Sequence, residues 1–192
     1  MLINSSIGTS TVRNQGNGIA EPIRRKLKEV FHFEDFFKNL VAHDTELFRH
    51  YLKKLTDKLE GLEGESNNDN KPGIVKWGTA RKCVNLVFRA TVYNGFIWDM
   101  HKLKKSDFNY DGLMNKLELP LDNHVVKGIR DDCKKYDLPF DKNKYLSFRI
   151  KSLKKEDSPY YQDKASQIAI KRKVCRIDLD LCYWRPQNNC DE

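Results

Sequence analysis

The chain has 192 residues, enough for one domain or for two small lobes that share a core. Its net charge of +8 favours an anionic partner, with nucleic acid ahead of an acidic membrane surface. The sequence lacks both a signal-peptide pattern and an apolar run long enough to cross a bilayer. We therefore expect a cytoplasmic, monomeric protein without a membrane partner.

The first third of the chain predicts helices after an irregular start. Residues 1–20 are rich in Ser, Thr, Asn and Gly and predict a loop or extended arm. Glu21-Pro22 opens a helix that runs to Phe31, because proline is tolerated in the first turn. A short element that is dense in phenylalanine follows over 33–40.

Asp44 can cap a helix over 46–59. Apolar side chains recur there every four residues and predict the buried side: Leu47, Tyr51, Leu55 and Leu59. Residues 63–72 are polar and without periodicity, so they predict a flexible loop.

A long apolar helix is expected over about 80–100, after Gly78 and Thr79, which fit a turn or cap. Lys82 then falls in the first turn, where desolvation and the positive end of the helix dipole disfavour a protonated amine. An unprotonated lysine amine is a nucleophile, so Lys82 is a candidate catalytic residue. Tyr93 and Trp98, further along this helix, are expected in the core.

A second informative stretch is Glu118-Leu-Pro-Leu-Asp-Asn-His-Val. Pro120 blocks a preceding helix, and Asp122 is placed to cap a helix over 123–136. Lys82 and Asp122 are forty positions apart, so only the fold can bring them together. Two more helical patterns follow, over 144–154 and over 159–173, the second with Lys164 on its outer side.

The sequence Gly78-Thr-Ala-Arg-Lys-Cys-Val-Asn85 resembles the hairpin of the helix-hairpin-helix DNA glycosylases, Gly-Val-Gly-Arg-Lys-Thr-Ala-Asn. Leu121-Asp-Asn-His-Val125 resembles their Val-Asp-Thr-His-Val segment. The chain differs at the second hairpin glycine, which is Ala80, and at Lys76-Trp77, where the family has Leu-Pro. Together with the longer gap between lysine and aspartate, these differences look most like the archaeal 8-oxoguanine DNA glycosylase branch.

The resemblance implies an all-α, two-lobed helical bundle with a helix-hairpin-helix-like element and a central cleft, formed by a single domain over 1–192. It also implies that Lys82 attacks the sugar C1′ and that Asp122 supports the positive charge there. The expected DNA contacts are Lys76, Gly78, Thr79, Arg81, His124 and Lys127.

The base pocket is also assigned by resemblance. The segment 175–185 alternates apolar and polar residues, which by itself would suit a strand. The archaeal branch instead ends with a helix that bears Leu-Asp-x-x-x-Trp, here Leu179-Asp180 to Trp184, and a pair at i and i+4 shares one helix face. Asp180 and Trp184 would then line the pocket, with Leu86 and with Gln15 from the N-terminal segment.

Five cysteines, an odd number, argue for free thiols in a cytoplasmic chain. Some relatives hold an iron–sulfur cluster in a four-cysteine loop, and Cys175 and Cys182 match its first spacing. The close Cys-x-x-Cys pair is missing, so the interpretation is small buried apolar residues, with no cofactor and no metal.

These features favour a DNA glycosylase that flips out and excises a damaged or modified base, with AP lyase activity through a Schiff base. Double-stranded DNA is the expected partner, with single-stranded DNA left open. One alternative is a non-catalytic helix-hairpin-helix module that only grips phosphate. Another is a glycosylase that acts on modified bases of foreign phage DNA in defence.

Overall fold

The computed structural model describes residues 2–9, 11–12, 17–42, 44–65, 71–101 and 110–184. Within these ranges the regular elements are helices. In addition, Glu63 and Ile74 form one isolated antiparallel bridge. The predicted all-α class is confirmed. None of the described helices combines the length and the apolar character needed to cross a membrane.

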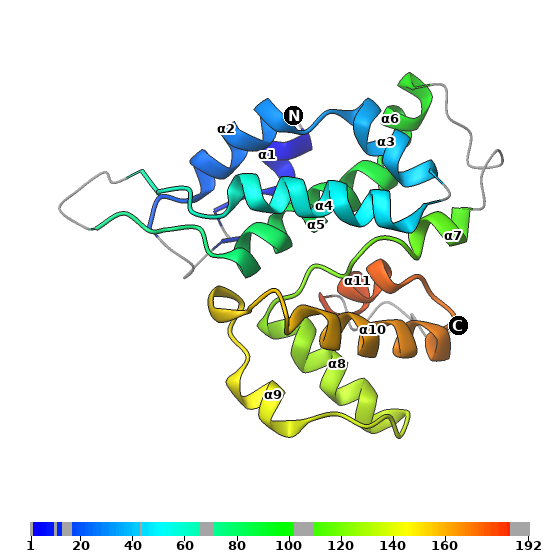
Figure 1. Cartoon of the computed structure of the whole chain (residues 1–192). Helices are drawn as coiled ribbons and strands as arrows, with labels where there is room; N and C mark the ends of the chain where they lie inside the picture. The colour runs from blue at the N-terminus through cyan, green and yellow to red at the C-terminus, as the bar shows by residue number, and fades with distance from the viewer. Residues whose placement is uncertain are drawn as a thin grey trace.

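The chain builds two groups of helices, which Figure 1 shows one above the other. The first group contains α1 (Leu2–Ser6), α2 (Ala20–Val30), α3 (Phe33–Val41), α4 (Thr45–Leu59), α5 (Trp77–Tyr93), α6 (Gly95–Met100) and α7 (Tyr110–Met114). The second contains α8 (Asn123–Lys135), α9 (Lys142–Ser147), η2 (Ile150–Ser152), α10 (Ser158–Arg172), η3 (Arg176–Asp178) and α11 (Leu179–Trp184).

Each group has its own apolar core. In the first lobe, Phe88 of α5 lies against Phe36 and Phe48, with ring centroids 4.7 and 5.5 Å apart. In the second lobe, buried residues of α8, α10 and α11 pack together, among them Ile129 and Ile168. Burial of two separate apolar sets explains why the chain divides into lobes near residue 118.

The N-terminal segment is partly helical, so the prediction of a loop or arm over 1–20 is wrong for Leu2–Ser6. Leu2–Ser6 forms α1, which packs on α5, and Ile7 is fully buried. The hydroxyls of Ser5 and Ser6 donate to Leu2 O, and these bonds close the short helix on itself. Apolar residues at 2, 3 and 7 thus outweigh the polar composition of the segment.

The expected helix over 80–100 is interrupted at Asn94. Its side chain accepts a hydrogen bond from Ile97 N and caps a new helix, α6, so the side-chain bond replaces the continuing helix. Beyond the break Trp98 is buried as predicted, whereas Tyr93 is 43% exposed. The pattern over 144–154 is likewise divided, because α9 ends at Ser147 and η2 follows.

Two further burial predictions are wrong. Leu47, expected in the core, is 52% exposed on the first turn of α4. Lys164, expected on the outer side, is buried on α10, with its ammonium 6.0 Å from the ring centroid of Tyr160. Both are errors in the assignment of the buried face, because periodicity predicts a helix but the face that is buried depends on neighbours that are distant in sequence.

Candidate active site

One stripe of α5 faces the second lobe over much of the length of the helix. Gly78, Lys82, Arg89 and Tyr93 are successively four, seven and four residues apart, so they lie on one side of the helix. Gly78 lies against Ile150 of η2, and Lys82 pairs with Asp122. Arg89 pairs with Asp180, and the Tyr93 hydroxyl donates to Asp178. The second lobe therefore meets α5 along its length.

Lys82 and Asp122 form an ion pair between the lobes, with Nζ 3.1 Å from Oδ2. Their side chains are only 10% and 11% exposed. Nζ also donates to Thr11 O at 3.1 Å, so the N-terminal segment contacts the same amine. The prediction that the fold brings Lys82 and Asp122 together is confirmed, whereas their catalytic roles stay predictions.

Asp122 divides its two oxygens between two tasks. Oδ1 accepts a hydrogen bond from Val125 N at 2.9 Å and caps α8, as predicted from the sequence. Oδ2 is left to face Lys82. Because the cap fixes the carboxylate to the N-terminus of α8, its position relative to α5 is set by backbone and not by a long flexible side chain.

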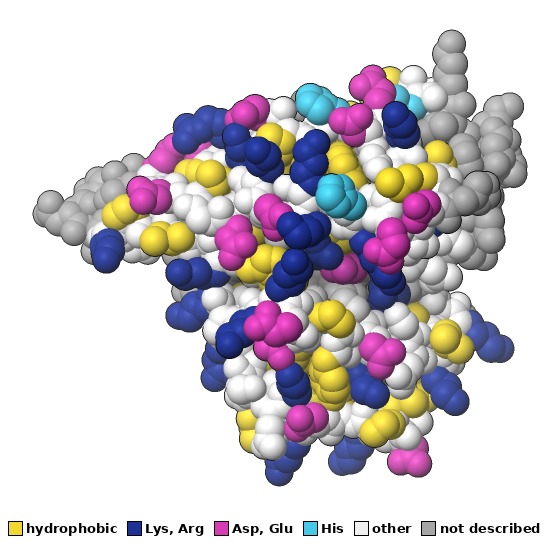
Figure 2. Space-filling view, in the orientation of Figure 1, with side chains coloured by type: hydrophobic (Ala, Val, Ile, Leu, Met, Phe, Trp, Pro, Cys, Tyr) yellow, Lys and Arg dark blue, Asp and Glu magenta, His cyan; other side chains and the backbone are white. Residues whose placement is uncertain are grey.

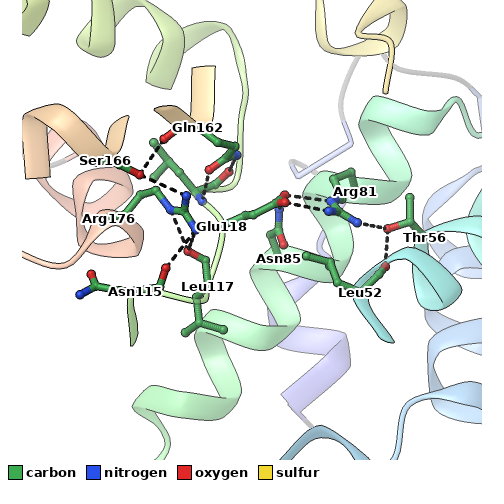
Figure 3. Close-up of polar contacts among 11 residues, drawn as sticks. Leu52, Thr56, Arg81, Asn85, Asn115, Leu117, Glu118, Gln162, Ser166 and Arg176 are labelled. Carbon is green, nitrogen blue, oxygen red and sulfur yellow. Dashed lines mark hydrogen bonds and ion pairs between the residues drawn. The ribbon is translucent and has the colours of Figure 1, made fainter. Parts of the chain in front are cut away.

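Arg81, the neighbour of Lys82, forms a second ion pair between the lobes (Figure 3). Its Nε and one terminal nitrogen donate to Glu118 at 2.8 and 2.7 Å, and the other donates to Thr56 at 3.2 Å. Both side chains are largely buried, at 13% and 18% exposed. Arg81, an expected DNA contact, is thus engaged in an internal ion pair in this structure.

The same cluster holds Glu118 ionised. Burial alone would raise the pKa of Glu118, but the hydrogen bonds and charge of Arg81 outweigh it. Arg176 and Asn85 act in the same direction, so the pKa lies below its ordinary value. Arg176 also donates to the carbonyls of Asn115 and Leu117, and this fixes the segment that leads to Asp122 (Figure 3).

The structure separates two residues expected in one base pocket. Asp180 is 4% exposed and pairs with Arg89, whereas Trp184 is 56% exposed. Trp184 stacks on His124 with ring centroids 4.5 Å apart, and His124 Nε2 lies 2.7 Å from Tyr183 O. The predicted helix is confirmed as α11, but its Asp and Trp point to different neighbours.

Sequence reasoning missed the contacts that dock α11 on α8. Tyr183 donates to Asp132 at 2.9 Å, and Arg172 donates to the other oxygen of that carboxylate at 2.8 Å. Burial and then the charge of Asp132 raise the pKa of Tyr183. The ring lies over Gly128, where an added Cβ would be 2.4 Å from it. A glycine within a helical pattern was the available signal, because such a glycine often marks a close contact.

The other expected DNA and base contacts differ in exposure. Gly78 and Thr79 are buried inside α5, which begins at Trp77, so their placement before the helix is wrong. Lys76 and Lys127 are exposed, and Leu86 is half-buried one turn after Lys82. Gln15 lies outside the described residues.

A groove of about 960 Å³ lies between the lobes, on the side of α4 and α10. Charged side chains of both signs line it, and Figure 2 shows them across the junction of the two lobes. Arg81, Glu118 and Arg176 contribute to its wall, but Lys82 and Asp122 do not. A groove is therefore present between the lobes, but the expectation that Lys82 and Asp122 face each other across it is wrong, because neither residue lines it.

The described cysteines are free thiols, and no described group of three His, Cys, Asp or Glu side chains is arranged to hold a metal ion. Burial raises the pKa of Cys83 to about 12. Cys190 lies outside the described residues.

Fold and site together define an all-α protein of two lobes with a buried lysine–aspartate ion pair between them. No protein-family model matches the sequence, and neither a curated protein nor a solved structure matches it.

Proposed function

We propose that this protein is a DNA glycosylase with AP lyase activity, in which Lys82 is the nucleophile and Asp122 the supporting carboxylate. The observation that carries the proposal is the 3.1 Å contact between Nζ and Oδ2, between two lobes and largely shielded from water. A charge placed in such a shielded site acts more strongly than in water. The net charge of +8 supports a nucleic-acid substrate.

The chemistry requires a flipped nucleotide with C1′ near Nζ. When the glycosidic bond breaks, its electron pair leaves with the base, and Asp122 stabilises the positive charge on C1′. Nζ is protonated in the ion pair, so it must lose a proton before it attacks, and the leaving base nitrogen can accept that proton. Nζ then bonds C1′, the sugar ring opens to a Schiff base, and β-elimination releases the 3′ phosphate.

The free protein keeps Nζ covered. Because Nζ contacts both Asp122 and Thr11 O, C1′ can approach only where the bond to Thr11 O opens. The proposal therefore requires that the hydrogen bond from Nζ to Thr11 O breaks when the sugar binds.

The test is borohydride trapping on duplexes that carry oxidised, deaminated, alkylated or hypermodified bases, the last of which represent foreign DNA. Borohydride reduces a Schiff base to a stable amine, so an adduct with one duplex would identify both the mechanism and the base. Lys82→Gln should abolish the adduct. Lys38→Gln, an exposed lysine on α3, is the matched control and should leave it unchanged.

The second candidate is a non-catalytic nucleic-acid-binding module. It is favoured because both residues have a structural role that needs no catalysis. Asp122 caps α8, and Lys82 neutralises the charge of Asp122. Salt-sensitive DNA binding without an adduct or abasic sites on any duplex would support this candidate. Abasic sites without an adduct would keep the glycosylase and remove Lys82 as nucleophile.

A further inference from the structure

The segment from Arg149 to Lys155, which contains η2, lies against the first turn of α5. A Cβ added to Gly78 would lie 2.1 Å from Ile150 O and 2.9 Å from the Leu153 Cβ. Gly78 is itself buried, and Thr79 is fully buried. The hairpin glycine to which the sequence assigned a DNA contact is thus covered by this segment, and a phosphate has no room beside it.

The outward side of the same segment is strongly basic. Ile150 and Leu153 point inward and are each 8% exposed, so the intervening residues face solvent. The exposed residues are Arg149, Lys151, Ser152, Lys154 and Lys155. None of its lysines pairs with a carboxylate elsewhere in the described part of the chain. Four positive charges within seven residues therefore have no neutralising partner among the described side chains.

A hollow of about 190 Å³ adjoins this basic side, and Arg149, Ser147 and Ser152 line it. Arg149 uses one N–H on Phe148 O, which leaves the rest of its five donors for an anion. Asp157 also lines the hollow, but Lys144 pairs with it and offsets its charge. The hollow has the size and the donors to take one phosphate group.

The position of the segment relates it to Lys82. Gly78 and Lys82 are four residues apart on α5, about 6 Å along the helix axis. Leu153 contacts Gly78 and borders, together with Lys82, a small internal hollow. The basic segment is therefore anchored, through Leu153, beside the turn of α5 that carries the candidate nucleophile.

We infer that Arg149, Lys151, Lys154 and Lys155 form a phosphate-binding surface for the backbone of duplex DNA. This surface would bind phosphate in place of Gly78, which the segment covers. The inference rests on the proposed function for its choice of DNA as the partner. It concerns binding and not the covalent step, so the two can fail separately.

The experiment measures the affinity of the full chain for a duplex with a tetrahydrofuran abasic-site analogue, by fluorescence anisotropy over a series of salt concentrations. The test variant carries Lys151→Gln, Lys154→Gln and Lys155→Gln. The control carries Lys28→Gln, Lys38→Gln and Lys134→Gln, which remove the same charge from exposed sites on α2, α3 and the distal end of α8. Circular dichroism verifies the fold of both.

Each lost phosphate contact reduces the slope of log K against log salt by about 0.9. We expect the test variant to lose about two to three units of slope and at least tenfold in affinity, with the control near wild type. Equal losses in both variants would overturn the surface and leave the glycosylase proposal intact. A selective loss in a protein that forms neither an adduct nor abasic sites on any lesion would keep the surface and overturn the glycosylase. A wild type that does not bind duplex DNA would overturn both.

Discussion

Arg81 and Glu118 form a two-point ion pair directly beside the contact of Lys82 with Asp122. Consecutive residues of α5 therefore bind two carboxylates four positions apart on the segment that enters α8. The first pair fixes that segment against α5 and so limits how far Asp122 can move from Lys82.

Glu118→Gln removes the charge that Arg81 requires. Loss of one partner of a largely buried pair costs about 3 kcal/mol, because the other charge is left unpaired. Urea unfolding at pH 7 should show this loss. Glu60→Gln, at an exposed helix end, is the control and should change the free energy of unfolding by less than about 0.5 kcal/mol.

The same pair predicts a pH dependence. The folded-state pKa of Glu118 is lowered, and the unfolded chain titrates at about 4.3. The stabilisation from Glu118 is therefore complete above about pH 4.3 and declines as the pH falls through the lower folded-state pKa. The difference between wild type and Glu118→Gln in urea unfolding should shrink only in that acid range. A difference that shrinks already between pH 7 and 5 would contradict the assignment.

Asp122→Asn and Asp122→Ala separate the two tasks of Asp122. Asparagine still caps α8 but carries no charge, whereas alanine removes the cap as well. We expect Asp122→Ala to be about 1 kcal/mol less stable than Asp122→Asn. If the carboxylate acts through its charge, both variants should lose base excision alike in single-turnover assays. Full excision by Asp122→Asn would remove the carboxylate from the mechanism.

Gly78→Ala tests the contact between the lobes at η2. The added methyl group would overlap Ile150 O, which is backbone, so the segment must shift, at a cost of about 1–3 kcal/mol. Gly95→Ala is the control, because a Cβ at Gly95 meets nothing within 4 Å. Thermal unfolding should show a lowered Tm for the first variant alone.

Tyr183→Phe tests the docking of α11. The hydroxyl donates to the buried carboxylate of Asp132, and loss of a hydrogen bond to a charged group costs about 2 kcal/mol. Chemical unfolding measures the loss. Tyr145→Phe is the control, because the described contact of Tyr145 is made by its ring, over which Arg130 lies, and the substitution keeps that ring. Equal stability of Tyr183→Phe and wild type would show that the hydroxyl does not hold α11.

The sequence alone determined most of the helices and their caps. Asp44 and Asp122 cap α4 and α8 as their local patterns predict, because a cap depends on residues two or three positions away. The local pattern also identified the capping aspartate after Pro120. The segment from Gly78 to Asn85, expected as a hairpin by resemblance, is instead part of α5, and the terminal helix was expected from the resemblance and not from its own alternating pattern. Among the described residues, local reasoning missed the break at Asn94, the helix at Leu2–Ser6, the start of α5 at Trp77 and the division between α9 and η2.

The partners of the charged side chains were decided by tertiary structure. Nothing near Arg81 in the sequence indicates Glu118, and nothing near Asp180 indicates Arg89, since these pairs are 37 and 91 positions apart. Their contacts arise only when the second lobe packs along one stripe of α5. Helix formation depends on neighbours within about four residues, whereas burial and pairing depend on which helix faces meet, and that is a property of the whole chain.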